Sequence, residues 1–503
     1  MKQRWLLILL FALTPTVALA QAEPEAPQTL VNQIDAIFTP IVNTMASVLL
    51  FDVFSVPLIV LWLVAGAIFF TFRMGFINLR AFKHAWFVIA GHYDDPAEEG
   101  EVTHFQALAA ALSATVGLGN IAGVAIAVSI GGPGAMFWMT VAGLFGMSSK
   151  FVECTLAQKY RIHLGNGQVA GGPMYYLSKG LSELGLRPLG KFLAALFAVC
   201  CIGAAFGGGN MFQANQSYVA VAGAFSQLFG ENTTLPSWIY GVGISILVAL
   251  VIIGGIRRIG AVAAALVPSM CAIYILASLW IILVNLPAVP GAVGSIISEA
   301  FLPKAVEGGF IGVLVQGLRR SAFSNEAGLG SAAIAHAAAR THEPVREGIV
   351  ALLEPFIDTV VICNMTALVV VITGEYADQS TAPGVETTAA AFGTVIEWFP
   401  LVLGLAVFLF AFSTMISWSY YGERAWTYLF GEQTMIIYRL MFVVCVFIGS
   451  VVNLGAVLDF ADMMLFSMAF PNILGAFLLS NKVLDDLNDY MARLKSGEMP
   501  VFK

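Results

Sequence analysis

The chain has 503 residues, of which 59% are hydrophobic and only 11% are charged. A soluble domain cannot bury so much apolar surface, so the composition excludes a soluble globular protein and predicts an all-α polytopic membrane protein. The formal net charge is -7, and the acidic residues gather in the short segments 94–101 and 485–489, a pattern that gives no support for nucleic-acid binding.

Residues 1–20 have the layout of a secretory signal peptide. Lys2 and Arg4 precede a short apolar run that ends in Ala18, Leu19 and Ala20. Cleavage after Ala20 would leave a polar leader, 21–51, in the periplasm. An uncleaved additional helix is the alternative.

Eleven apolar stretches after this signal are predicted to be membrane spans. An odd number of spans puts the two ends of the mature chain on opposite sides of the membrane. Most of the 24 Lys and Arg residues then fall on one side, which the positive-inside rule assigns to the cytoplasm. We therefore expect a multi-pass protein of the bacterial inner membrane with a periplasmic N-terminus and a cytoplasmic tail, 481–503. The predicted spans are 52–72, 104–130, 135–160, 190–224, 237–255, 261–285, 309–339, 346–373, 390–422, 434–453 and 456–480.

The second and seventh predicted spans are interrupted by similar glycine-rich phrases. The first reads TVGLGNIAGV at 115–124, and the second reads NEAGLGSAAI at 325–334. The two spans run in opposite directions, and each opens a block of five spans, 104–285 and 309–480. This arrangement is typical of an inverted repeat with broken helices at corresponding positions. Glycines that only let helices pack closely are the alternative, but they do not explain the matched positions.

A helix that is broken inside the bilayer leaves backbone groups without partners, which is unfavourable unless something polar binds them. Free N–H groups suit a carboxylate, and free carbonyls suit a small hard cation or an ammonium group. The residues therefore suggest a cation-coupled carrier of amino-acid-like solutes. A channel would need polar residues along whole helices. An enzyme would need a metal motif or an activated nucleophile, which the sequence does not offer; His336 stands alone near the end of its span.

The fourth predicted span carries a polar stripe on one helical face. Asn210, Gln213 and Ser217 follow one another at spacings of three and four residues. We expect this stripe to face the transport pathway, because a buried amide in lipid is unfavourable. Gln213 is the preferred substrate contact and Gln216 the alternative, while hydrogen bonding between helices would explain the stripe without any substrate.

Charged residues inside the predicted spans are further functional candidates. Two interpretations stay open for them. The charges pair with each other to hold the seventh and eighth spans together, which we favour, or one carboxylate carries a coupling proton. The residues concerned are Arg319, Arg320, Glu326, Glu354 and Asp358, and a separate internal pair is predicted between Lys150 and Glu153.

Several phrases resemble the alanine/glycine:cation symporter (AGCS) family: TVGLGNIAGVAIA, GGPGAMFWM, AGGPMYYL, NEAGLGS and FSTMISWSYYGERAW. The resemblance covers nearly the whole mature chain. It implies sodium-coupled uptake of alanine or glycine by the amino acid-polyamine-cation superfamily fold. This is a leucine-transporter-like five-plus-five inverted repeat, here with 52–72 as one extra N-terminal transmembrane helix. A proton as the coupling ion, and glutamine, serine or a D-amino acid as the solute, remain alternatives. We expect no organic cofactor, and a monomer whose partners are the amino acid and the lipid bilayer.

The resemblance also implies positions for the substrate and the ion. It puts the substrate carboxylate near free amides of Gly117 and Gly119, and it makes Trp418 the residue that limits substrate size. Asn120 would orient the substrate or an ion, or simply cap a helix. The complete set of expected substrate contacts is Thr115, Gly117, Gly119, Asn120, Gln213, Phe323, Thr414 and Trp418. For sodium the expected ligands are carbonyls of Ser113 and Val116 with the hydroxyl of Ser413 or Ser417.

Overall fold

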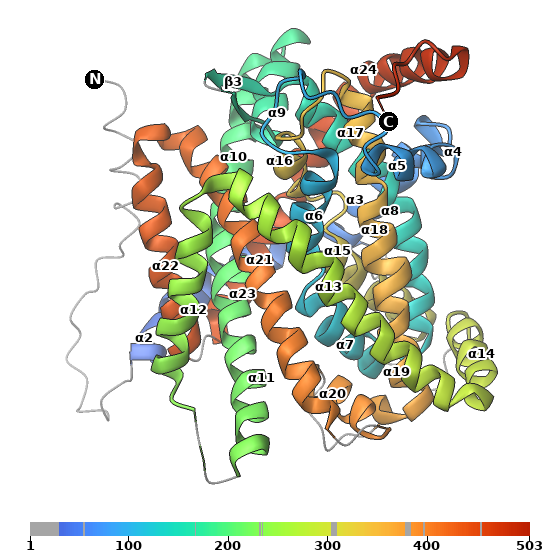
Figure 1. Ribbon diagram of the computed structural model, residues 1–503, viewed down its shortest axis with the longest axis vertical. Coiled ribbons are helices and arrows are strands. Elements are labelled where there is room, and N and C mark those ends of the chain that lie inside the picture. Colours follow the sequence, from blue (N-terminus) through green and yellow to red (C-terminus); the bar gives the residue numbers. More distant parts are fainter. Residues whose placement is uncertain are drawn as a thin grey trace.

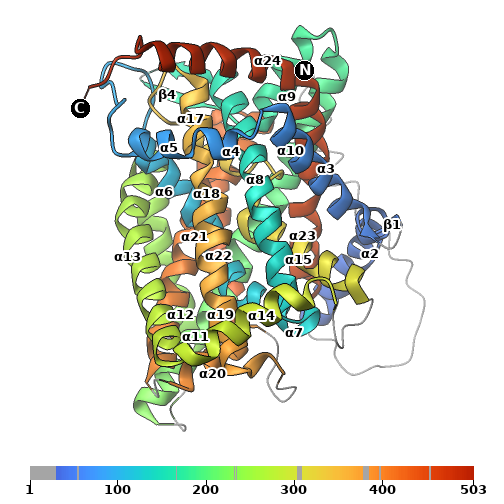
Figure 2. The same cartoon turned by 90° about the vertical axis from the view of Figure 1, so that its right-hand side faces the viewer.

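The computed structural model describes residues 30–53, 56–165, 167–230, 233, 235–302, 309–377, 384–395, 398–452 and 455–502. In these ranges nearly all regular structure is helical, and the long helices stand side by side along one axis of the molecule (Figure 1, Figure 2). The strands form two short antiparallel pairs. One joins β1 (Asp52–Val53) to β2 (Val56–Pro57), and the other joins β3 (Ile162–Gly165) to β4 (Gln168–Ala170).

From residue 30 onwards, the structure describes four helices before the first predicted repeat: α2 (Leu30–Leu49), α3 (Leu58–Arg73), α4 (Ile77–Arg80) and α5 (Phe82–Ile89). The predicted extra transmembrane helix corresponds to α3, which packs against α8 and α24. The indole of Trp62 on α3 donates a hydrogen bond to the Ala469 carbonyl at 3.2 Å. The predicted signal, 1–20, lies outside the described residues, and α2 occupies most of the predicted leader.

The first repeat begins at a capping box, in which Thr103 and Gln106 each bond the other's backbone N–H at the start of α6. The helix α8 starts directly after Gly132 and Pro133, and Gly132 has a φ of 68° that favours glycine. The elements of this repeat are α6 (His104–Thr115), the π-helix η1 (Gly119–Gly123), α7 (Val124–Gly131), α8 (Gly134–Lys159), α9 (Pro173–Glu183), α10 (Arg187–Phe206), the π-helix η2 (Gly207–Met211), α11 (Phe212–Phe229), α12 (Ser237–Ile252) and α13 (Gly255–Val284).

A short 3-10 turn η3 (Leu286–Ala288) and α14 (Val289–Glu299) lead to the second repeat. Its first helices pack against the first repeat: α15 lies on α8 and α7, and α16 lies on α6 and α8. The elements are α15 (Gly309–Asn325), α16 (Ala332–His336), α17 (Pro344–Ala351), α18 (Leu353–Pro355), the π-helix η4 (Phe356–Cys363), α19 (Asn364–Thr373), η5 (Glu375–Ala377), α20 (Val385–Gly393), α21 (Phe399–Phe430), η6 (Glu432–Thr434), α22 (Met435–Val451), α23 (Gly455–Ser467) and α24 (Ala469–Ser496).

Within the described ranges, seven helices are long and apolar enough to cross a membrane, or eight if the bent pair of α6 with η1 and α7 is one span. The apolar helices α3 and α12 are shorter, so the count of eleven spans stays a prediction. The predicted start of the ninth span at 390 is wrong: α20 ends at Gly393 and α21 begins at Phe399. A proline in the first turn of α21 explains this, because proline is tolerated there and not inside a helix.

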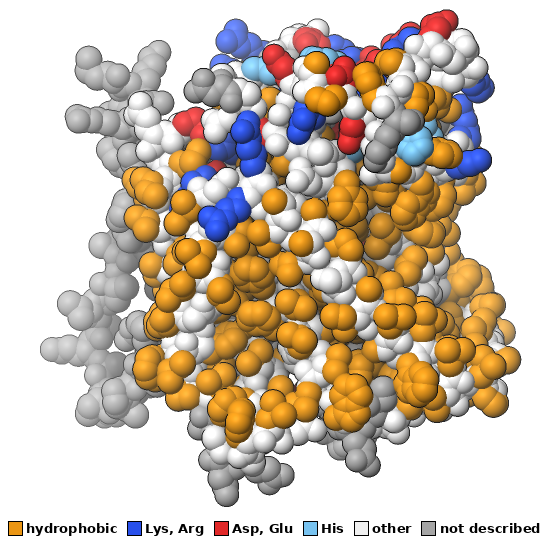
Figure 3. Space-filling view, in the orientation of Figure 1, with side chains coloured by type: hydrophobic (Ala, Val, Ile, Leu, Met, Phe, Trp, Pro, Cys, Tyr) orange, Lys and Arg blue, Asp and Glu red, His pale blue; other side chains and the backbone are white. Residues whose placement is uncertain are grey.

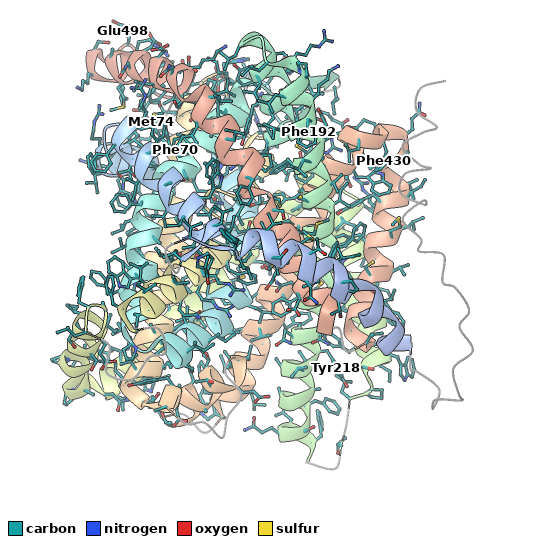
Figure 4. The ribbon with its side chains drawn as sticks, turned by 180° about the vertical axis from the view of Figure 1, so that it is seen from behind. Phe70, Met74, Phe192, Tyr218, Phe430 and Glu498 are labelled. Carbon is teal, nitrogen blue, oxygen red and sulfur yellow. The ribbon has the colours of Figure 1, made fainter. Side chains whose placement is uncertain are left out.

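The surface separates into an apolar belt and a charged end. Lys and Arg side chains gather at the top of Figure 3, where α9, α17 and the end of α24 lie in Figure 1, and orange side chains cover the face below them. Figure 4 shows the opposite face, with Glu498 at the charged end and Tyr218 of α11 towards the other end. Large apolar side chains such as Leu276, Trp280 and Leu440 are more than half exposed, as expected for helices that face lipid.

Candidate functional site

The first glycine-rich phrase breaks its helix. The axes of α6 and of the following helical piece (119–131) differ in direction by 54° across the break. Asn120 closes the turn, because its Oδ1 accepts a hydrogen bond from the Gly117 N–H at 2.8 Å. The expectation that the Gly117 amide is free for a substrate is therefore wrong. The Asn120 carbonyl, which the π-helical turn also displaces, accepts a hydrogen bond from the Thr366 hydroxyl at 2.8 Å.

The second phrase also breaks its helix, between Asn325 and Ala332. Three residues of this break have positive φ angles: Glu326 at 54°, Gly328 at 91° and Gly330 at 83°. Side chains bind the backbone groups that the break frees. Asn325 Oδ1 accepts from the Ala327 N–H at 3.0 Å, and Asn472 Nδ2 donates to the Gly328 carbonyl at 2.8 Å. Both matched phrases are therefore true helix breaks in the middle of apolar helices.

The two breaks lie next to each other, and Asp358 connects them. A methyl group on Gly119 would lie 3.3 Å from the Ser324 Cα, which shows how closely the two segments approach. Asn120 Nδ2 donates to Asp358 Oδ1 at 2.6 Å, and the Ser324 hydroxyl donates to Asp358 Oδ2 at 2.8 Å. The hydroxyl of Thr359 also donates to Oδ2, at 2.7 Å. One fully buried carboxylate on η4 thus receives hydrogen bonds from both broken segments.

A small cavity of about 30 Å³ lies where the breaks meet. Seven of the eight predicted substrate contacts line it, Asn120 being the exception. The Thr414 hydroxyl and Gln213 Oε1 have no hydrogen-bond partner among the described residues, so the hydroxyl can donate to or accept from a solute and Oε1 can accept from it. Trp418 closes one side, where it leaves so little room that a methyl group on Gly209 would collide with its Cγ. The lining residues are Ala114, Thr115, Gly117, Leu118, Gly119, Ala204, Gly208, Gly209, Gln213, Phe323, Glu326, Thr414, Trp418 and Leu465.

The polar stripe of the fourth span does not face the cavity as a whole. Gln213 does, and its Nε2 donates to the Gly208 carbonyl at 3.1 Å. Asn210 points to α22, where it donates to the Phe442 carbonyl at 2.8 Å, and the Ser217 hydroxyl bonds the Tyr240 hydroxyl on α12 at 2.6 Å. The prediction was wrong for these two residues. Asn210 lies within the π-helical turn η2 (Gly207–Met211), where the helical register differs from that of α11, and Ser217 lies one turn beyond Gln213, where α11 packs against α12.

The predicted sodium ligands gather between α6 and α21. The hydroxyls of Ser113 and Ser417 are hydrogen-bonded to each other. The Ser413 hydroxyl donates to the Ser113 carbonyl at 3.3 Å, and the Ser113 hydroxyl donates to the Ser413 carbonyl at 3.3 Å. Val116 follows directly as the C-terminal cap of α6 and is buried. These oxygen atoms are neutral and close together, the donor type that a hard monovalent cation prefers.

The charges in the spans pair differently from the prediction. Lys150 bonds Glu354 of α18 at 3.0 Å, and Glu153 accepts from Asn472 Nδ2 at 3.0 Å, so the internal pair of Lys150 with Glu153 is wrong. His336 does not stand alone, since its Nδ1 lies 2.5 Å from Glu347 Oε1. Sequence reasoning missed Glu347 altogether and gave Asp358 only a structural or proton-carrying role. In the sequence, both Glu347 and Asp358 are recognisable as carboxylates inside an apolar span, which marks them as functional candidates.

Two further cavities continue from the central one towards the end of the molecule opposite the charged end. The next, of about 160 Å³, shares Leu118, Gly208 and Phe323 with the central cavity. The outer cavity, of about 560 Å³, shares Ala122, Ile126 and Phe212 with this second cavity. It reaches α20 and the end of α11. These two helices lie at the bottom of Figure 1. Ala114 and Thr115 at the end of α6 line the central cavity, and α16 packs against α6.

A mostly helical membrane protein, in which two broken helices meet beside a buried cavity, belongs to the secondary active transporters. The fold matches the crystal structure of MhsT in complex with L-phenylalanine with a TM-score of 0.53 over 76% of this chain and 89% of MhsT, at 14% sequence identity. The predicted leucine-transporter-like fold is thereby confirmed.

The chain belongs to the sodium:alanine symporter family, whose pattern matches residues 36–503. It is 42% identical to the sodium/alanine symporter AgcS of Methanococcus maripaludis over 452 residues, which cover 89% of this chain and 96% of that protein. It is 37% identical to the amino-acid carrier protein AlsT of Bacillus subtilis over 444 residues, with coverage of 88% and 91%. It is 35% identical to the probable sodium/glutamine symporter GlnT of the same bacterium over 453 residues, with coverage of 90% and 91%. The family consists of transporters rather than enzymes, as the sequence predicts.

Proposed function

We propose that this protein takes up small neutral amino acids, alanine and glycine, together with sodium ions by alternating access. The observation that carries the proposal is the cavity at the meeting point of the two helix breaks, which is small, buried and lined by hydroxyl and amide groups without partners. One relative is named for alanine and another for glutamine, so the names of the relatives do not decide between these solutes. We infer the solute from the shape of the cavity instead. Trp418 and Gly209 leave no room for a long side chain, which favours alanine and glycine over glutamine.

The substrate carboxylate would bind at the first break, near the backbone of Gly119 and the hydroxyl of Thr414. The ammonium group of the substrate could pair with Glu326. Among the described residues that line the cavity, Glu326 is the charged one. Asn120 would act indirectly by holding the turn through Gly117. Phe323 and Trp418 would enclose the small apolar side chain of the substrate.

Sodium would bind at the cluster of Ser113, Ser413 and Ser417, with the Val116 carbonyl as a further ligand. Binding an ion there would replace the hydrogen bonds that these hydroxyls now make with each other. Asp358 would assist from the other side of the first break, because its carboxylate adds negative charge beside Asn120. Proton coupling is the second candidate. Asp358 is the residue that favours it, because burial penalises a negative charge and a buried carboxyl can therefore hold a proton.

The charged end would face the cytoplasm, following the positive-inside rule (Figure 3). The C-terminal part of α24 would then lie at the cytoplasmic surface and the N-terminus in the periplasm. The cavities that reach the opposite end would form the entry path from outside. This arrangement corresponds to a carrier that is open outwards and closed inwards.

Uptake of radiolabelled alanine into right-side-out membrane vesicles tests the proposal. We expect uptake when a sodium gradient is directed inwards and little uptake when potassium replaces sodium. Unlabelled glycine and L-alanine should compete, whereas glutamine, serine and D-alanine should compete more weakly. Uptake that follows a proton gradient without sodium would establish the proton-coupled alternative, and strong competition by glutamine alone would overturn the assignment of the solute.

Two substitutions in the site should change uptake in different ways. Asn120→Ala removes one hydrogen-bond partner of the Gly117 N–H and one of the Asp358 carboxylate. Unmade buried hydrogen bonds cost about 1–3 kcal/mol each, which predicts an uptake rate lower by roughly tenfold or more.

Trp418→Ala should instead widen the cavity, so that larger amino acids compete with alanine. The matched control is Trp398→Ala, since Trp398 lies just before the same helix α21 but is 61% exposed. Wild-type rates and competition profiles in both site variants would remove the site assignment.

A further inference from the structure

Glu347 holds two half-helices together at the charged end of the molecule. One of its oxygen atoms meets Nδ1 of His104, the first residue of α6. The other lies 2.5 Å from Nδ1 of His336, the last residue of α16. The side chains of all three are 0% or 1% exposed. A single carboxylate on α17 thus connects the half-helix that follows one break to the half-helix that precedes the other.

Backbone hydrogen bonds also join the segments next to these two half-helices. The chain before α6 pairs with the chain after α16, where the Glu101 N–H donates to the Ala338 carbonyl and the Arg340 N–H donates to the Val102 carbonyl, each at 2.8 Å. Polar contacts of this kind can be exchanged for contacts with water when the segments separate. The breaks beside α6 and α16 leave both half-helices able to move without unwinding the rest of their spans.

The buried charges continue from Glu347 into the protein. Glu354 lies 3.0 Å from Lys150, and both are fully buried. Between the two groups of residues, His336 Nε2 faces Glu354 Oε2 at 3.9 Å, and neither atom has a hydrogen-bond partner among the described residues. One proton on His336 Nε2 would supply a donor for Glu354. The charges of Glu347, His336, Glu354 and Lys150 would then alternate in sign and sum to zero, whereas without that proton these four residues together carry one net negative charge.

We propose that this cluster is a proton-binding site that latches the cytoplasmic side of the carrier. As α6 and α16 close together, a proton leaves the cytoplasmic water and forms an N–H bond at His336 Nε2; when they separate, that bond breaks and the proton returns to the water. The assignment of this end to the cytoplasm rests on the proposed function. Because the closed state binds one more proton than the open state, its share of the population rises as the pH falls.

Other titratable groups around the cluster set the pH range of this switch. Asp94 lies 3.8 Å from His104 Nε2 with 37% of its side chain exposed, so it connects the cluster to water. Arg161 interacts electrostatically with Glu347 from the loop after α8. The other groups that face the cluster are Glu153 and Cys154 on α8, Glu326 at the second break and Tyr421 on α21.

Hydrogen exchange in the purified full-length protein, without any amino acid, tests the latch directly. After correction for the intrinsic pH dependence of exchange, the amides of α6 and of the segment after α16 should lose about tenfold of their protection between pH 6 and pH 8. The variant Glu347→Gln should show less than a twofold change over this range. The matched control is Glu423→Gln, which removes another buried carboxyl at the same end, bonded by Arg439 at 2.5 Å, and should keep the wild-type pH dependence.

If Glu347→Gln fails to fold, His336→Gln provides the same test, because it keeps a polar side chain but removes the group that takes up the proton. Protection that does not change with pH in the wild-type protein, or a pH dependence that survives in both variants, would overturn the proposal. In vesicles, sodium-driven alanine uptake should also fall at least fivefold as the internal pH is lowered from 8 to 6. A pH-dependent latch in a protein that transports no alanine would disprove the proposed function and leave the proton site standing.

Discussion

Replacing Asp358 by Asn is expected to abolish sodium-driven alanine uptake. The carboxylate accepts hydrogen bonds from Asn120 on one side and from Ser324 and Thr359 on the other. An amide cannot accept on both sides, and it carries no negative charge. Losing two charge-assisted hydrogen bonds of about 1.5 kcal/mol each corresponds to a loss of roughly a hundredfold in the rate of uptake.

The measurement is the initial rate of alanine uptake in vesicles that contain equal amounts of each variant, as judged by quantitative immunoblotting. Asp459→Asn is the control, because Asp459 is an exposed carboxylate on α23 and its loss should leave the rate unchanged. A separate measurement of uptake against sodium concentration distinguishes two roles. If Asp358 supports the cation, the residual uptake of Asp358→Asn needs much more sodium, whereas uptake that keeps the wild-type sodium dependence would contradict that role.

The helix breaks could be predicted from the sequence because their signal is local. Glycines in matched phrases interrupt apolar spans in two halves of opposite direction, and at the second phrase Gly328 and Gly330 adopt positive φ angles that favour glycine. The cavity then follows, since polar groups without backbone partners have to meet somewhere inside the bilayer. Seven of the eight predicted substrate contacts surround this cavity, and most of their positions were implied by the resemblance to the symporter family rather than by the breaks.

The π-helical turns could not be predicted in the same way. Three of them, η1, η2 and η4, hold Asn120, the Gly207–Gly209 segment and Asp358. Each inserts one extra residue into a helical turn, so residues at spacings of three and four no longer share a face. Neither glycine content nor apolar periodicity reveals such an insertion, which is why Asn210 turns towards a neighbouring helix rather than the pathway.

Which buried charged residues pair with each other could not be predicted from the sequence either. Spacing along one helix brings Lys150 close to Glu153, but a buried cation takes the carboxylate with the best geometry, and that partner comes from another helix 204 residues away. Likewise, the contact of His104 with Glu347 joins residues 243 positions apart. Intramembrane charges mark important positions in the sequence, while the pairing among them depends on how the helices cross.

The pair of Lys150 and Glu354 offers a second large effect, this time on stability. Replacing Lys150 by Met leaves the fully buried Glu354 without its cation, and breaking a buried pair in this way destabilises a protein by about 3–5 kcal/mol. We expect a clear drop in the temperature at which the detergent-solubilised protein loses its monodisperse peak in size-exclusion chromatography. Glu354→Gln alone should also destabilise, since it leaves the ammonium group of Lys150 unpaired.

The double variant Lys150→Met with Glu354→Gln decides whether the pair itself is responsible. Because it removes both charges at once, it should recover most of the lost thermal stability, and the two single effects should therefore not add. A pair exposed to water gives the matched comparison: Lys159 and Asp486 lie 2.6 Å apart with about 30% of each side chain exposed, and Lys159→Met should have little effect. If the double variant is as unstable as the sum of the single ones, the two side chains stabilise the protein by packing, and the electrostatic account of the buried cluster is wrong.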